Sequence, residues 1–413
     1  MRLNKIFEEQ LAKISLSDSE IKAMNKVSKD FVKSMKVEGL NAYIGGSFAK
    51  GTSVKKDSLQ DIDIFVVFKS EKEIKRLGSV LKKINFDGFL KKVHGSRDYY
   101  QIIRPEVVLE IVPVVKNTDP SKANNVTDVS LSHVKYVRKK TKESPKLINE
   151  IKLAKSFVRA NRCYGAESYI NGFSGYSLEL LIIYFGGFGN FLKKIGKVDV
   201  IDMENYFKSK KQIMMELNSS KLRGPLVLVD PTYKFRNVCA GLGQESYNKF
   251  VEIAKDFLKS PDISYFSRKN IDILELRRIA SKNKARYVEM ELECKKQEGD
   301  VAGSKMRKFT DFIVSEMKRH GQEVVYNDFE YFGFGGISKA YFVVKEKNVA
   351  ERRGPPVNLK QQSNSFKKVN GNTVFIKKGF LWVKINTGVK LVLDNIEKFE
   401  KEMSVKIRKL VLE

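Results

Sequence analysis

The apolar positions of the N-terminal part of the chain follow helix spacing first and strand spacing afterwards. The stretch "SDSE" at residues 17–20 is a capping-box pattern that predicts a helix to about Met35, before Gly39. The apolar runs Asp61–Phe68 and Val107–Val115 are typical of strands. This order of elements predicts a small α/β domain.

From about Lys139 the apolar spacing becomes that of helices, most clearly in "LINEIKLAKSFVRA" and "YSLELLIIYF". A break follows at Ser260 and Pro261. Beyond it, the strand patterns "ARYVEMELEC", "EVVYNDFEYF" and "KAYFVVKEK" alternate with an amphipathic helix at Lys305–His320. This part of the chain is therefore expected to mix helices with strands.

Residues 347–372 have the composition of a loop-rich, basic connector, and short strands with a helix near Leu393–Met403 follow. We see no internal repeat. We therefore expect an α+β multidomain fold, divided into residues 1–138, 139–262 and 263–413, because single cores rarely exceed roughly 250–300 residues.

Basic residues are in large excess. The chain has 77 Lys and Arg against 49 Asp and Glu, a formal net charge of +28, and the basic residues occur in every region. This excess favours a polyanion as partner, and nucleic acid over a membrane. A generic basic, solvated surface is the alternative explanation.

The sequence gives no sign of a membrane or of an oxidising compartment. The N-terminal "MRLNKIFEEQ" has charges where a signal peptide needs an apolar core, and the most apolar stretch, Leu178–Phe188, is too short to span a bilayer. The three cysteines are far apart and form no C-x-x-C pair, which argues against a disulfide framework or a zinc site. We expect a cytoplasmic protein.

Acidic residues interrupt two of the apolar strands. Asp61 and Asp63 are two positions apart, so a strand would place both carboxylates on one face. Their repulsion is relieved if a cation lies between them, and Mg²⁺ bound by carboxylates and a substrate phosphate is the common case. Glu110 in the second strand would supply a third ligand. The alternative, acids that face solvent or pair with lysines, is less favoured for three acids in two apolar strands.

A glycine pair precedes the first of these strands. In Gly45-Gly46-Ser47 the backbone could approach phosphate oxygens closely, while Ser47 adds a hydroxyl and Lys50 a positive charge. A tight turn explains the glycine pair equally well by itself. Common nucleotide-binding motifs do not fit, because Thr52 stands where a Walker loop has lysine and Ser338 interrupts the later G-x-G-x-x-G pattern.

A glycine–serine turn, Asp-x-Asp on one strand and a third acid on another resemble the polymerase-β-type nucleotidyltransferases. The stretches "NRCYGAESYINGFSGYSLELLIIYFG", "LVDPTYKFRNVCA" and "RRGPP" extend the likeness to the archaeal-type (class I) CCA-adding enzymes over nearly the full length. The resemblance implies a nucleotidyltransferase α/β head, a helical neck, and an α+β body and tail that bind tRNA. It also implies template-independent addition of C, C and A to tRNA 3′ ends from CTP and ATP.

The resemblance further implies roles for individual residues. Mg²⁺ would be held by Asp61, Asp63 and Glu110, which are also the catalytic residues. The implied nucleotide-binding residues are Gly46, Ser47, Lys50, His133, Lys155, Tyr164 and Arg236. In this family Lys50 is usually Arg and Glu110 is usually Asp, and the Asp-x-Asp pair replaces Glu-x-Asp.

Several of these residues have a plainer interpretation from pattern alone. Lys155 reads as a solvated lysine, Tyr164 as a half-buried core ring, and His133 as a surface imidazole. Arg236 could form a salt bridge with Asp230 and still read a base. Lys155 and Tyr164 would face the same side only if the helix between them ends near residue 162.

The expected mechanism is two-metal nucleotidyl transfer. One metal on the three acids would lower the pKa of the RNA 3′-OH, and a second would orient the α-phosphate and stabilise the leaving pyrophosphate. Two other readings remain open: an enzyme that forms oligo- or poly(A), and a catalytically dead RNA-binding relative.

The last third of the chain carries the candidates for RNA contact. By the resemblance, the body and tail would hold the acceptor stem and T arm of tRNA. The candidate RNA-binding residues are Arg286, Arg307, Lys308, Arg352 and Arg353. The interleaved aromatic run Tyr331, Phe332 and Phe334 is more typical of a sheet core than of a stacking platform. The oligomeric state stays open, with a homodimer as one option.

Overall fold

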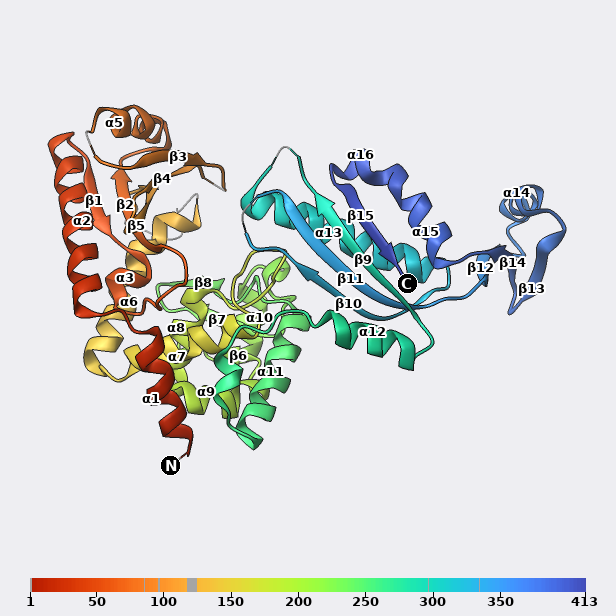
Figure 1. Ribbon diagram of the computed structural model, residues 1–413, viewed down its shortest axis with the longest axis horizontal. Coiled ribbons are helices and arrows are strands. Elements are labelled where there is room, and N and C mark those ends of the chain that lie inside the picture. Colours follow the sequence, from red (N-terminus) through yellow and green to blue (C-terminus); the bar gives the residue numbers. More distant parts are fainter. Residues whose placement is uncertain (1, 85, 96, 117–124, 296, 334) are drawn as a thin grey trace. The chain divides into compact units, whose positions relative to one another are not determined.

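The computed structural model describes residues 2–84, 86–95, 97–116, 125–295, 297–333 and 335–413 (Figure 1). The chain forms two compact units, Met1–Lys269 and Asn270–Glu413. Their boundary lies shortly after residue 262, where the sequence suggests the start of the last domain. The further division of the first unit near residue 138 stays a prediction. Within the described ranges, no helix combines the length and apolarity that a membrane crossing requires.

A mixed five-stranded sheet forms the framework at the start of the first unit. Its order is β1 (Asn41–Ile44), β2 (Gln60–Phe68), β5 (Val107–Val115), β4 (Tyr99–Ile103) and β3 (Phe89–Val93). Only the central pair, β2 with β5, is parallel. Both predicted apolar strands are confirmed, and they are these two central neighbours. The short helices α3 (Gly46–Lys50), α4 (Glu71–Ile74) and α5 (Leu77–Lys83) lie between the strands in sequence.

Helix α2 (Asp18–Val37) packs beside this sheet, next to β1 (Figure 1). The predicted capping box is present, since the Ser17 side chain accepts from the Glu20 N–H and the Glu20 carboxylate accepts from the Ser17 N–H at 2.7 Å. Phe31 and Met35 are fully buried against the apolar strand residues. Gly39, with φ +74°, turns the chain into β1.

The rest of the first unit is mainly helical. Its helices are α1 (Arg2–Ile14), α6 (Ser130–Glu143), α7 (Leu147–Ala160), α8 (Gly175–Phe185), α9 (Phe188–Lys194), α10 (Lys210–Glu216) and α11 (Gln244–Lys259). A small sheet of β6 (Val200–Ile201), β7 (Val227–Asp230) and β8 (Tyr233–Asn237) accompanies them. The two predicted helices of this region are confirmed as α7 and α8.

An aromatic cluster fills the core of this helical part. Phe157 on α7 is fully buried, and its ring centroid lies 5.1 Å from that of Phe257 and 5.4 Å from that of Phe188. Further rings pack around it, from Phe250, Tyr265 and Phe266. The apolar face of α7 is therefore held from several elements at once.

The second unit is built on an antiparallel sheet of β10 (Glu323–Glu330), β11 (Ile337–Lys345), β9 (Arg286–Glu293) and β15 (Lys406–Leu412). Its helices include α12 (Ile273–Lys282), α13 (Gly299–Arg319), α15 (Val389–Ile396) and α16 (Glu400–Met403). Helix α13 begins earlier than predicted, because Ala302 and Gly303 are buried and extend its apolar face by a turn before Met306. The helix expected near 393–403 is divided between α15 and α16.

The prediction of a loop-rich connector at residues 347–372 is wrong. The segment forms β12 (Val349–Pro356) and α14 (Lys360–Asn370), and β12 joins β14 (Phe380–Asn386) and β13 (Val374–Lys377) in a three-stranded sheet. Arg352 and Arg353 are paired with Val383 and Trp382 of β14. The sequence of β12 lacks apolar alternation, so this strand depends on its pairing with β14, which lies later in the chain. The overall expectation of an α+β multidomain fold is confirmed.

We predict that Phe157→Ala lowers the free energy of unfolding of the first unit by about 3–5 kcal/mol, since it leaves a cavity among packed rings. The chain has a single tryptophan, Trp382 in β14 of the second unit. Urea unfolding followed by far-UV circular dichroism should therefore shift, while Trp382 fluorescence should not.

The control for this prediction is Phe89→Ala on β3, whose side chain is 68% exposed. It should change stability by at most about 1 kcal/mol. An equal effect of both substitutions would contradict the assignment of Phe157 to the centre of the core.

Candidate active site

The three acidic residues meet at the centre of the five-stranded sheet. In the parallel register of β2 and β5, Asp63 is the direct partner of Glu110, and Asp61 lies two residues earlier on the same face. Burial, with the nearby charges of Glu110 and Asp61, raises the pKa of Asp63 to about 7. Burial also raises the pKa of Glu110. The cluster is therefore short of positive charge.

Two neighbours partly satisfy these carboxylates. The Lys56 ammonium donates to Asp61 Oδ1, and Gln101 Nε2 on β4 donates to Glu110 Oε1 at 2.9 Å. The alternative considered from the sequence, that these acids pair with lysines, is thus correct for Asp61. As the side chains lie in this structure, no three His, Cys, Asp or Glu among the described residues are already arranged to hold a metal ion, so a metal at these three acids would require their carboxylates to reorient.

The donor set nevertheless suits a divalent cation. All three side chains offer carboxylate oxygens, which hard cations prefer, and the raised pKa of Asp63 marks a place where added positive charge is stabilising. Such an ion would take over the role of Lys56 at Asp61. That these three residues are the metal ligands stays a prediction.

The glycine pair fits tightly against this cluster. Gly46 has φ +57°, and a Cβ there would lie 1.5 Å from Asp63 Oδ2. The Gly45 N–H donates to the Asp63 carbonyl at 2.7 Å, and a Cβ on Gly45 would lie 2.1 Å from the Phe65 ring. Ser47, whose hydroxyl lies 3.0 Å from that of Ser53, follows in the first turn of α3. The glycines thus let the junction of β1 and α3 lie directly against an acidic side chain.

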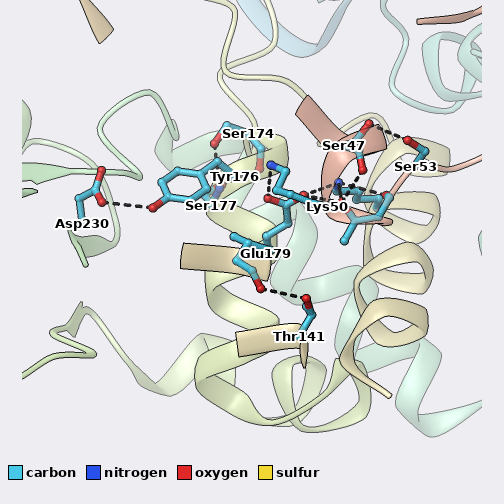
Figure 2. A network of polar contacts seen from close by, with 12 residues as sticks. Ser47, Lys50, Ser53, Thr141, Ser174, Tyr176, Ser177, Glu179 and Asp230 are labelled. Atoms are coloured by element: carbon cyan, nitrogen blue, oxygen red, sulfur yellow. Dashed lines mark hydrogen bonds and ion pairs between the residues drawn. The ribbon is translucent and has the colours of Figure 1, made fainter. Parts of the chain in front are cut away.

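Lys50 and Lys155 converge on a residue that the sequence analysis did not select, Glu179 of α8. Figure 2 shows Lys50 beside Glu179. Their ammonium groups lie 2.6 Å and 2.8 Å from its two carboxylate oxygens. The interpretation of Lys155 as a solvated lysine is wrong, because only 3% of this residue is exposed. The signal that could have found Glu179 was present: it is a lone acid in an apolar helix, as Glu110 is in a strand.

Tyr164 lies close to Lys155, as expected if the intervening helix ends in time. Helix α7 ends at Ala160, and Arg162 has φ +61°. A Cβ on Gly175 would lie 2.8 Å from the Tyr164 hydroxyl and 4.0 Å from Lys155 Cε, so both side chains reach the start of α8. The expectation that Tyr164 is half-buried is confirmed.

A second buried carboxylate, Asp230 at the end of β7, gathers the remaining candidates. Arg236 on β8 lies 2.8 Å from Asp230 Oδ2, which confirms the expected salt bridge, and His133 Nε2 lies 3.2 Å from the same oxygen. His133 is buried, so its interpretation as a surface imidazole is wrong, and burial lowers its pKa. Asp230 is buried too, but His133 and Arg236 hold its pKa well below the usual range.

Tyr176 on α8 connects these groups and was also missed from the sequence. Its ring stacks on that of His133 with centroids 4.0 Å apart, and its hydroxyl donates to Asp230 Oδ1 at 3.2 Å (Figure 2). The Lys50 ammonium lies 5.9 Å from the centroid of the same ring. Candidate nucleotide-binding residues far apart in sequence are thus in contact within one unit.

The five candidate RNA-binding residues all belong to the second unit but do not form one cluster. Arg286 on β9 pairs with Glu346 at 2.8 Å, and Arg307 on α13 pairs with Asp311 at 3.0 Å, while Lys308 is exposed. On β12, Arg352 donates to Asn370, and the Arg353 guanidinium lies 3.4 Å from the Phe380 ring centroid.

The nearby aromatic run is divided between core and surface. Tyr331 is buried, as expected for a sheet core, whereas 54% of Phe332 is exposed. Phe334 lies outside the described residues.

Comparisons with known proteins agree with this geometry. A nucleotidyltransferase domain matches residues 25–152, and the second domain of tRNA nucleotidyltransferases matches residues 149–267. The CCA-adding enzyme of Nanoarchaeum equitans is 35% identical over 292 residues, 69% of each chain. That of Methanocaldococcus jannaschii is 29% identical over 394 residues, 90% of this chain and 82% of the relative. This chain belongs to the CCA-adding enzyme family.

Solved structures support the fold. A Cid1 poly(U) polymerase matches with a TM-score of 0.51 at 14% identity, over 65% of this chain and 99% of that chain. At this identity the likeness concerns the nucleotidyltransferase fold alone. Nucleotidyltransferases generally use divalent metals, which agrees with the oxygen donors of Asp61, Asp63 and Glu110.

We predict that Gly46→Ala reduces CTP incorporation into tRNA, the reaction of this family, by about 100-fold or more, because its Cβ would displace the Asp63 carboxylate. Gly39→Ala is the matched control, since Gly39 also has positive φ but has no atom near its added Cβ. Both substitutions add backbone strain of about 1 kcal/mol, and Gly46→Ala also bears the cost of displacing Asp63. Incorporation assays and thermal melts would test this, and equal losses of activity would contradict it.

Proposed function

We propose that this protein acts in the cytoplasm and adds C, C and A to the 3′ end of tRNA from CTP and ATP, without a nucleic-acid template and with release of pyrophosphate. The observation that supports it best is the register of β2 and β5, which sets Asp63 beside Glu110 in a chain of the CCA-adding family. Asp61 on the same face completes the catalytic set.

In this proposal Asp61, Asp63 and Glu110 hold Mg²⁺. When bound, the ions would acidify the RNA 3′-OH and neutralise charge on the departing pyrophosphate. The three carboxylates orient the site from rigid strands at the centre of the sheet, where their positions are fixed by backbone pairing. A cation held by Asp61 would compete with Lys56, which donates to the same carboxylate here.

The triphosphate is bound by the start of α3 and by two lysines. Gly46 and Ser47 bring the turn against the acids, and the small side chains leave room for phosphate oxygens. Lys50 Nζ has three donors, of which Glu179 takes one, and Lys155 adds a second positive charge behind it. Tyr164 borders the same end of α8.

The base is read by Arg236, with His133 beside it. Asp230 holds one nitrogen of the guanidinium, and a quarter of the Arg236 side chain is exposed, so further N–H donors remain for base oxygens or nitrogens. His133 is fixed between Asp230 and the ring of Tyr176. The arginine is thus oriented before a nucleotide arrives, which favours selective binding.

The tRNA acceptor stem and T arm are bound by the body and tail, residues 263–413, and the head and neck are residues 1–138 and 139–262. A-form RNA is recognised mainly by its phosphates and 2′-hydroxyls, which a basic surface suits. The net charge of +28 supports this reading. The proposed contacts are Arg286, Arg307, Lys308, Arg352 and Arg353.

We predict that the protein completes tRNA ends and then stops. Three transcripts, ending before the first C, after the second C, and with complete CCA, are each incubated with Mg²⁺ and labelled CTP or ATP. A denaturing gel should resolve two C additions on the first, one A addition on the second, and none on the third. Long A ladders on any RNA would indicate a poly(A)-forming enzyme instead.

We predict that Asp63→Ala abolishes incorporation and leaves the Kd for tRNA within a few-fold, because the acid lies in the catalytic sheet and the proposed RNA contacts lie in the other unit. Gel-shift titration and single-turnover assays measure the two properties. Asp87→Ala, which removes an exposed acid of the same unit, serves as control and should preserve both. Parallel loss of binding and incorporation by the Asp63 variant would count against the assignment.

A further inference from the structure

Glu179 is a buried acid at a place where helix packing alone would favour an apolar residue. It lies on α8 with Leu178, Leu180 and Leu181, all fully buried, and its own exposure is 0%. A charged group in such a position is stable only when it is paired and hydrogen-bonded. Its partners therefore indicate why the acid is there.

Among the described residues, the hydrogen-bond partners of Glu179 come from the proposed triphosphate side of the site. Oε2 accepts from Lys50 Nζ at 2.6 Å, and Oε1 accepts from Lys155 Nζ at 2.8 Å and from Thr52 Oγ1 at 2.7 Å. Burial alone would raise the pKa of Glu179, but the charges of Lys155 and Lys50 outweigh burial and bring it down to about 2. The carboxylate is thus ionised and joins α3, α7 and α8.

The two lysines use this carboxylate differently. Lys155 Nζ donates to Glu179 and also to the Thr52 carbonyl at 3.2 Å and the Thr52 hydroxyl at 3.0 Å, which occupies its three donors. Lys50 is held by Glu179 at one donor. Because two lysines share one carboxylate, this trio carries one net positive charge, and a polyphosphate is a suitable counter-charge.

We propose that Glu179 is a positioning residue for the triphosphate. From α8 it holds the ammonium groups of Lys50 and Lys155 in place, so that Lys50 can bind phosphate oxygens and Lys155 adds its charge behind it. The proposal rests on the proposed function, since it takes these lysines as the groups that meet the triphosphate. The triphosphate is common to CTP and ATP. Glu179 therefore acts on both substrates equally and has no part in choosing the base.

Helix α8 also carries Tyr176, which contacts Asp230 on the side of the site proposed to read the base. Tyr176 lies three residues before Glu179 on α8, so the two side chains share a face of the helix. Figure 2 shows Tyr176 directed toward Asp230 and Glu179 directed toward Lys50. Because the two side chains contact different parts of the proposed nucleotide site, substitutions at Glu179 and Asp230 should change KM and the CTP-to-ATP ratio differently.

The test measures KM and kcat for CTP and ATP, equilibrium binding of each nucleotide, and the Tm of Glu179→Gln. We expect KM for both nucleotides to rise by the same factor, about tenfold or more, with the CTP-to-ATP ratio and the Kd for tRNA unchanged. Glu179→Asp, which retains the charge but is shorter, should recover part of the nucleotide affinity.

The matched control is Glu150→Gln. Glu150 lies on α7, and its Oε2 accepts from the Phe188 N–H at 2.6 Å, so it supports α9 outside the site. This variant should lower Tm without a change in KM. A Glu179 variant that behaves like it, losing Tm alone, would overturn the proposal.

A double-mutant cycle with Lys50→Met tests the mechanism. If Glu179 acts through Lys50, adding Glu179→Gln to Lys50→Met should raise KM much less than it does in the wild-type background. Fully independent effects would overturn the proposal, as would a changed preference between CTP and ATP. If Glu179→Gln does not fold, Glu179→Asp takes its place in the cycle and the same outcomes apply.

These results separate this inference from the proposed function. A wild-type protein that binds CTP but does not extend tRNA would refute the proposed function, while the same double-mutant cycle, followed by equilibrium nucleotide binding instead of KM, would still decide the role of Glu179. A wild-type protein that extends tRNA, with a Glu179 variant that behaves as the Glu150 variant does, would refute the inference alone.

Discussion

The parallel pairing of β2 with β5 is the constraint on which the candidate site depends. Both strands run in the same direction, and their register sets Asp63 directly beside Glu110. A slip of one residue would turn one of these acids to the opposite face of the sheet. The apolar residues on either side of Asp63, Ile62 and Ile64, are fully buried and prevent that slip.

Around this sheet, buried carboxylates rather than apolar contacts hold the nucleotide-binding candidates. Glu179 and Asp230 are both fully buried, and each binds cationic or polar side chains from several elements. Such pairs add little net stability, because desolvation offsets much of their attraction, but they fix geometry sharply. The helical part of the first unit obtains its stability elsewhere, from the aromatic core around Phe157.

Much of this architecture could be predicted from the sequence, where local pattern and final environment agree. The capping box of α2, both central strands and helices α7 and α8 follow from short-range spacing. The acids Asp61, Asp63 and Glu110 were recognisable because a charge in an apolar strand conflicts with packing. Their contact, however, required the strand order, which spacing does not contain.

The failures have a common physical cause, since each depends on a distant neighbour. Lys155 and His133 look solvated by pattern but are buried against Glu179 and Asp230, which lie 24 and 97 positions away. Strand β12 lacks apolar alternation and is ordered by β14.

The position of Tyr176 and Glu179 on one face of α8 has a mechanical consequence. A shift of this helix would move Tyr176 and Glu179 together, so the phosphate side and the base side of the pocket cannot be adjusted independently through α8. If the proposed roles hold, a change that alters the base side alone has to involve elements other than α8, such as β8, which carries Arg236.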